Sequence, residues 1–250
     1  GGGRRREIMG RLRPLSAVLE CAMVVWCSSV IGLGSSSDPT HGFTQVAFRC
    51  SIQKPYDRNV SERFSFHDGV YDFRVYSTDK PHFKGSATKP RTELRVLDHD
   101  YTSGVWQFEG DFYVASSTTG VCIMQVFGGR RGVGPTALRL HIVNKDLIAY
   151  NEGTPSKTVA NSITGRWVHL NVIHDADEHT MAVYIDSVLT FFADNASDKS
   201  HYFKCGVYEQ HNPSSYMESQ WKNIILWRKS GRQHSIAQDQ FSSSPQSCVG

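Results

Sequence analysis

The chain has 250 residues and a mass of 28.0 kDa, which suffices for one large domain with a buried core. Its formal net charge is +3, but five of its 27 basic and two of its 24 acidic residues lie in the first 34 positions, which leaves 22 residues of each sign. This neutral remainder argues against a nucleic-acid or anionic-membrane partner.

The first 34 residues are typical of a secretory leader. Basic residues precede an apolar run at positions 15–33, which ends in a glycine and three serines, and Met9 is the expected start. A single membrane anchor is the alternative, but the run is short for a span and contains Glu20. We therefore expect cleavage, no membrane contact afterwards, and a secreted, cell-wall or vacuolar protein.

Short strand-like runs follow, separated by turns rich in Gly, Pro, Asn, Asp and Ser. The organisation predicted from them is an N-terminal extension at 35–51, one domain at 52–229 and a polar tail at 230–250. The eleven runs are 69–76, 91–96, 105–114, 121–127, 137–143, 147–150, 166–174, 181–185, 189–193, 204–210 and 221–227. So many short strands without βαβ alternation predict an all-β protein, an antiparallel β-sandwich of the jelly-roll kind.

Four cysteines remain after the leader: Cys50, Cys122, Cys205 and Cys248. An even number in a secreted chain predicts disulfides, with three pairings open. Strand parity turns Cys122 and Cys205 away from the polar faces described next, either as a disulfide or as two buried thiols. No Cys-x-x-Cys pair exists, which argues against a zinc site. We expect no metal and no cofactor.

Two Asn-x-Ser sequons, at Asn59 and Asn195, are candidate glycosylation sites in turn-like contexts.

Several strands gather their polar side chains on one face. Period-2 alternation places one set of residues on a common side of the stretch 202–210 and a second set on a common side of run 91–96. The two sets are Tyr202, Lys204, Tyr208 and Gln210, and Arg91, Glu93 and Arg95. Other strands expose Gln107, Arg139 and His141 in the same way. These residue types bind sugars and carboxylates, so we expect a ligand groove.

Three of these motifs carry a family resemblance. Arg91-Thr-Glu-Leu-Arg95, Gln125-Val-Phe127 and Tyr202-Phe-Lys-Cys-Gly-Val-Tyr-Glu-Gln210 resemble the signature strands of the alginate-lyase-type jelly rolls. Residues 52–229 resemble more closely the plant citrate-binding protein group of that superfamily. The resemblance implies a curved sandwich with an open cleft on its concave sheet.

The chemistry that this resemblance implies is β-elimination on a polyuronate. A base removes the proton next to the uronate carboxylate, and the neighbouring glycosidic bond breaks. By position in the motifs, Arg91 and Gln125 would neutralise the carboxylate while Tyr208 acts as acid and base.

The remaining candidates surround that centre. The resemblance implies that Arg95, Lys204, Tyr202 and Gln210 line the subsites, and Gln107 joins them as a substrate-binding candidate. Glu93 is expected to orient the two arginines as an ion pair, with substrate contact as the alternative.

Phe127 departs from the family pattern, which has a catalytic histidine at this place. His82 is the first candidate for a catalytic histidine supplied from another strand, and His99 and His141 are weaker candidates. Two functions therefore stay open. The chain is either a lyase for a glucuronic-acid-rich polymer, or a non-catalytic protein that binds citrate or a cell-wall polyuronate. Its expected partner is an acidic polysaccharide or a small citrate-like carboxylate.

Overall fold

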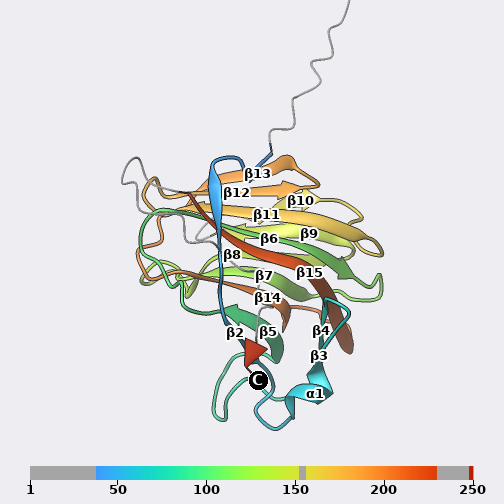
Figure 1. Ribbon diagram of the computed structural model, residues 1–250. Coiled ribbons are helices and arrows are strands. Elements are labelled where there is room, and N and C mark those ends of the chain that lie inside the picture. The colour runs from blue at the N-terminus through green and yellow to red at the C-terminus, as the bar shows by residue number, and fades with distance from the viewer. Residues whose placement is uncertain (1–37, 152–155, 230–247, 250) are drawn as a thin grey trace, which may run out of the picture. The chain divides into compact units, whose positions relative to one another are not determined.

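Alternating apolar and polar residues build two eight-stranded sheets in the computed structural model, which describes residues 38–151, 156–229 and 248–249 (Figure 1). Nearly all neighbouring strands pair antiparallel, and β16 pairs parallel with β2. The predicted fold class, an antiparallel β-sandwich, is confirmed. The predicted leader and most of the polar tail lie outside the described residues. Within the described ranges, no helix is long and apolar enough to cross a membrane.

Sheet A has the order β13-β12-β11-β6-β15-β4-β3, and β1 pairs with the C-terminal end of β15. Its strands are β1 (Phe43–Val46), β3 (Phe64–His67), β4 (Val70–Tyr76), β6 (Val105–Val114), β11 (Trp167–Asp175), β12 (Thr180–Ile185), β13 (Val188–Asp194) and β15 (Tyr216–Lys229). The short helix α1 (Val60–Arg63) precedes β3.

Sheet B has the order β10-β9-β8-β7-β14-β5-β2-β16. Its strands are β2 (Cys50–Gln53), β5 (Arg91–Val96), β7 (Val121–Phe127), β8 (Thr136–Val143), β9 (Asp146–Asn151), β10 (Lys157–Ala160), β14 (Tyr202–Glu209) and β16 (Cys248–Val249). The three signature motifs lie on β5, β7 and β14, and β14 is paired with the other two.

Each of the eleven predicted runs overlaps a strand of the structure. The strands that the sequence did not indicate are β1, β2, β3, β10 and β16, each of four residues or fewer. Segments this short show too little alternation to stand out from turns. Because β1 and β2 pair with longer strands, the sheets already begin within the segment assigned to an N-terminal extension.

The space between the sheets is filled by large apolar side chains. Phe73, Phe108, Phe112, Phe203 and Trp221 are all almost completely buried. Burial of each such side chain contributes about 1.5–3 kcal/mol. Since one face of each strand is used in this way, the polar residues of sheet B must point away from sheet A.

The cysteines settle the pairing that the sequence left open. Cys50 and Cys248 form a disulfide, whereas Cys122 and Cys205 are buried free thiols. Cys205 belongs to the apolar core, but Cys122 lies directly opposite Tyr208 on the neighbouring strand. Opposed residues share a face of the sheet, so the two thiols point to opposite sides. The prediction that Cys122 points away from the polar face is wrong. A bulge in β7 between Cys122 and Met124 turns its side chain to the same face as Tyr208.

The predicted sequons differ in their accessibility. Asn59 is exposed just before α1. Asn195 is 1% exposed, and its Nδ2 donates to Ala137 O at 3.1 Å and to Asn151 Oδ1 at 2.9 Å. A buried amide that makes two hydrogen bonds leaves no room for a glycan, so the prediction for Asn195 is wrong.

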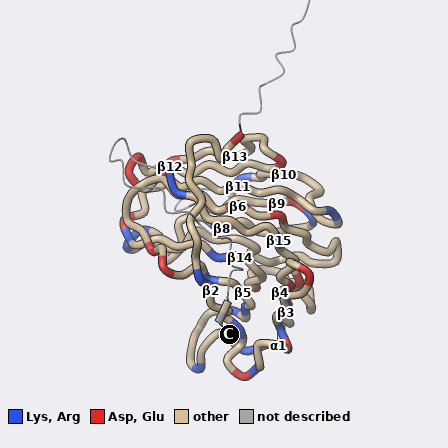
Figure 2. Tube along the Cα trace, viewed as in Figure 1, with Lys and Arg blue, Asp and Glu red and all other residues tan. Residues whose placement is uncertain are grey.

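Charged residues of both signs are interspersed over the described part of the chain, without a large region of a single sign (Figure 2). This distribution agrees with the balanced charge count.

Gly206 allows β14 to pass close to β5. Its φ is +138°, a conformation that side chains disfavour, and a Cβ there would press on the carbonyl oxygen of Thr92 and lie 2.8 Å from Glu93 Cα. The glycine therefore lets β14 change register between Cys205 and Tyr208.

Gly206→Ala should lower the free energy of unfolding by about 2–3 kcal/mol, because strain and a backbone clash act together. The matched control is Gly69→Ala, where φ is +77° but the new Cβ meets open space; it should lose about 1 kcal/mol. Urea denaturation measures both. Equal losses would show that close approach at Gly206 is unimportant.

Candidate functional site

A cavity of about 550 Å³ opens on the face of sheet B that is turned away from sheet A. Side chains of β2, β5, β7, β8, β9 and β14 line it, together with loop residues near His82 and Pro135. It brings together six of the predicted site residues, namely Arg91, Gln125, Tyr208, His82, Lys204 and Tyr202.

Strand register explains this convergence. Lys204 on β14 lies opposite Gln125 on β7, which in turn lies opposite Arg139 on β8. Tyr208 lies opposite Arg91 on β5. Side chains that are opposed across antiparallel strands share a face, so these residues meet over the same surface.

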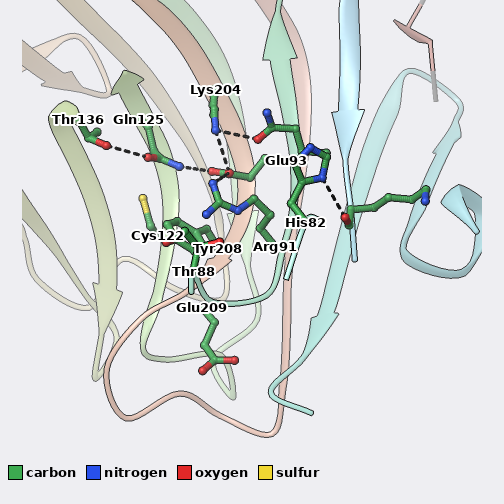
Figure 3. Close-up of polar contacts among 12 residues, drawn as sticks. His82, Thr88, Arg91, Glu93, Cys122, Gln125, Thr136, Lys204, Tyr208 and Glu209 are labelled. Carbon is green, nitrogen blue, oxygen red and sulfur yellow. Dashed lines mark hydrogen bonds and ion pairs between the residues drawn. The ribbon is translucent and has the colours of Figure 1, made fainter. Parts of the chain in front are cut away.

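Glu93 is the buried anion beneath this surface. It is fully buried, and its Oε1 accepts a hydrogen bond from Gln125 Nε2 (Figure 3). Its Oε2 lies 3.4 Å from Arg91 Nη1 and 3.5 Å from Lys204 Nζ. Glu93 does not line the cavity, and it pairs with Arg91 and Lys204. The predicted pair with Arg95 does not form, because Arg95 pairs with Asp100 instead.

Lys204 is held by a second partner, Gln53. Its ammonium donates to Gln53 Oε1 at 2.7 Å, and only 2% of the residue is exposed. Burial lowers the pKa of Lys204, and the neighbouring Glu93 carboxylate opposes that shift. The lysine is therefore a fixed donor at the cavity wall.

The guanidinium of Arg91 lies over the ring of Tyr208. Its guanidinium carbon is 3.8 Å from the ring centroid, which is a close cation–π contact. Its Nε is buried without a hydrogen-bond partner among the described residues. Arg91 lines the cavity, and its Nη2 has no hydrogen bond within the described residues, so the guanidinium keeps a donor for a ligand carboxylate.

Phe127 gives the cavity an apolar wall. Its ring stacks on Tyr202 with centroids 4.8 Å apart, and Lys204 Nζ lies 5.3 Å from its centroid. His82 stands elsewhere in the lining, where its Nδ1 lies 3.0 Å from the carbonyl oxygen of Lys54. Within the described ranges, no histidine hydrogen-bonds to Tyr208 or Gln125.

The cavity carries an excess of positive charge. Arg91, Lys204 and Arg139 contribute three cations to its lining, and among the described residues Glu93 is the anion that pairs with two of them. Arg139 has no ion-pair partner in the part of the chain that the structure describes. The arrangement can bind an anion, and its aromatic rings can pack against a sugar face.

Besides Glu93, three predicted substrate-binding residues lie outside this cavity. Gln107 is buried on β6 of sheet A, so its prediction is wrong; periodicity assigns a face but not a sheet. Arg95 is paired with Asp100 at 2.7 Å and lies 4.0 Å over the Tyr202 ring, behind the cavity wall. Gln210 lines a separate, adjacent cavity. His99 is also elsewhere, with Nε2 2.7 Å from Ala47 O.

Sequence reasoning missed Gln53 and Tyr150 as cavity residues. Gln53 ends a four-residue strand that gave no periodic signal. Tyr150 is the partner of Arg139 across β8 and β9, and only the register reveals this. Arg139 itself stood on a predicted polar face but was not assigned to the site.

Burial lowers the pKa of His141 to about 3, and the positive charge of Arg139 adds to the effect. In the unfolded chain this pKa is about 6.5. As the pH falls below 6.5, the unfolded state takes up the proton first, so stability must fall toward pH 3.

His141→Leu should therefore flatten the loss of stability between pH 6 and pH 4 by about 1.4 kcal/mol per pH unit. Urea denaturation at several pH values, compared between wild type and variant, measures the difference. Parallel curves would mean that His141 titrates normally in the folded protein.

Comparison with known proteins places these observations in a family. The alginate lyase family model matches residues 49–227. A citrate-binding protein from Hevea brasiliensis is 44% identical over 201 residues, covering 79% of this chain and 82% of the relative.

Solved structures share the fold. A family 7 alginate lyase in complex with substrate superposes with a TM-score of 0.59 at 16% identity, covering 74% of this chain and 95% of that chain. An alginate lyase from Pseudomonas aeruginosa gives a TM-score of 0.58 at 15% identity, covering 73% and 98%.

Proposed function

The chain belongs to the alginate lyase family, and on this premise we propose that its cleft binds a uronate-type carboxylate without cleaving it. The observation that carries the proposal is the centre formed by Arg91, Gln125 and Tyr208. It has the carboxylate-binding groups of a lyase, but Phe127 stands where the family has its histidine.

The binding half of the proposal rests on charge and geometry. The Arg91 guanidinium is held by Glu93 on one side and by the Tyr208 ring on the other, so little side-chain freedom is lost when a ligand binds. Lys204 and Arg139 add positive charge, and the stacked rings of Phe127 and Tyr202 offer an apolar surface. The name of the Hevea relative, a citrate-binding protein, supports a carboxylate ligand.

The absence of cleavage follows from what elimination requires. A base must take a weakly acidic carbon-bound proton while donors stabilise the developing enolate. Tyr208 would have to be base and acid alone, because Phe127 cannot titrate. One amide hydrogen of Gln125 is already committed to Glu93. Loss of a positioned base typically lowers a rate by about 10²–10⁴-fold.

A lyase is the second candidate, because His82 lines the same cavity as Tyr208. In that case His82 would supply the imidazole that position 127 lacks. The substrate would be a glucuronic-acid-rich polymer, cleaved by β-elimination.

Arg91→Gln should weaken glucuronate and citrate binding by about 10–100-fold, because it removes the charged fork for the carboxylate. Arg49→Gln is the matched control, since Arg49 pairs with Asp98 at an exposed position outside the cavity. Isothermal titration calorimetry measures both. Unchanged affinity in Arg91→Gln would exclude Arg91 as the binding group.

The same protein preparation decides between binding and cleavage. Incubation with glucuronan should produce no absorbance from unsaturated uronate ends. Turnover that Tyr208→Phe abolishes and His82→Ala lowers would replace the binding proposal with the lyase.

We also propose that the protein follows the secretory route to the cell wall or the vacuole. The leader-like residues 1–34, the disulfide and the exposed sequon at Asn59 support this. Amino-terminal sequencing of the mature protein should begin near residue 35, and an intact amino terminus would contradict it.

A further inference from the structure

The cleft on sheet B continues beyond the cavity described above. A second cavity of about 360 Å³ shares Arg139 and Tyr150 with the first. It follows β8 to His141 and is bounded on its other side by Gln210 and His211. A ligand that reaches Arg139 from the first cavity can therefore extend into the second.

His141 is a buried polar residue whose side chain is not fully hydrogen-bonded within the described residues. Only 5% of it is exposed, and its ring lies against Tyr150 with centroids 4.2 Å apart. Its Nε2 has no hydrogen-bond partner among the residues described. Its lowered pKa keeps the imidazole neutral at ordinary pH, so it can exchange a hydrogen bond with a hydroxyl group. An unpaired buried nitrogen is unfavourable unless a ligand or water satisfies it.

Arg139 is the cation of this second cavity. It is half-buried and has no carboxylate partner within the described ranges. Its guanidinium carbon lies 5.7 Å from the ring centroid of Tyr150, and its Nη1 lies 3.5 Å from Gln210 Oε1. The Arg91 guanidinium instead lies over Tyr208, on a strand to the other side of β7. The two arginines thus form separate cationic centres.

The walls of the second cavity are fixed by backbone hydrogen bonds. Gly120 N donates to Ile142 O at 2.9 Å, and Gln210 N donates to Gly120 O at 2.7 Å. Asn144 N donates to Thr119 Oγ1 at 2.9 Å. Such a cavity exists before the ligand arrives, so binding requires little ordering of the chain.

We propose that Arg139, His141 and Gln210 form a second subsite, which takes a carboxylate at Arg139 and a sugar hydroxyl at His141. The preferred ligand is then a linear oligouronate that fills both cavities, rather than a single small carboxylate. The inference rests on the proposed function, because it assumes that the first carboxylate binds at Arg91. A citrate or uronate monomer occupies the first centre alone.

The test compares a monomer with an oligomer. Glucuronate and a linear glucuronate tetrasaccharide are titrated calorimetrically into the full-length mature protein. The wild type should bind the tetrasaccharide at least about tenfold more tightly, because hydrogen bonds to a charged group contribute about 1.5–3 kcal/mol and about 1.4 kcal/mol is a factor of ten.

Two variants change the second cavity alone. His141→Leu removes the unpaired nitrogen, and His211→Glu places a negative charge at an exposed position, where folding is not at risk. Each should lower tetrasaccharide affinity by about fivefold or more, and glucuronate affinity should stay within about twofold. The Arg91→Gln variant should lower the affinity for both the tetrasaccharide and glucuronate.

The outcomes separate the two proposals. If the tetrasaccharide binds no better than glucuronate, or if neither variant affects it while Arg91→Gln does, the second subsite is wrong and the first stands. If Arg91→Gln changes neither ligand, the proposed function itself fails.

Discussion

The buried carboxylate of Glu93 is the interaction on which the cleft depends. A fully buried anion is unfavourable unless partners surround it, and Gln125, Arg91 and Lys204 provide them from three strands. In meeting that requirement, the three side chains become fixed relative to one another. One anion also leaves the surrounding cations in excess, so the site keeps its attraction for an external carboxylate.

Preorganisation of this kind separates binding from chemistry. Arg91 is oriented by Glu93 and by the Tyr208 ring, so a carboxylate finds its donors in place. Elimination needs a titrating group as well, and Phe127 supplies a stacking surface instead. A single substitution in an otherwise retained motif can therefore leave recognition intact and remove the reaction. Fold alone cannot decide this, because one architecture supports both outcomes.

Local alternation predicted much of this architecture, and long-range register determined the rest. The bounds of β5 and β6 agree with those predicted, because their apolar and polar residues alternate clearly. The bounds of β7 agree as well, because its short apolar run is flanked by glycines. Alternation does not reveal which sheet a strand joins, so Gln107 was assigned to the wrong side of the molecule. A bulge changes the face to which the preceding side chains point, so the face of Cys122 was predicted wrongly. The cavity residues Gln53 and Tyr150 come from strands whose neighbours only the folded register defines.

The most direct measurement is a crystal structure of the protein with glucuronate bound. The account predicts the uronate carboxylate within hydrogen-bond distance of the Arg91 guanidinium, with Glu93 still bonded to Gln125 and the sugar ring packed against Phe127 or Tyr202. A carboxylate bound away from Arg91, or an Arg91 that leaves Tyr208 to close fully on Glu93, would contradict it.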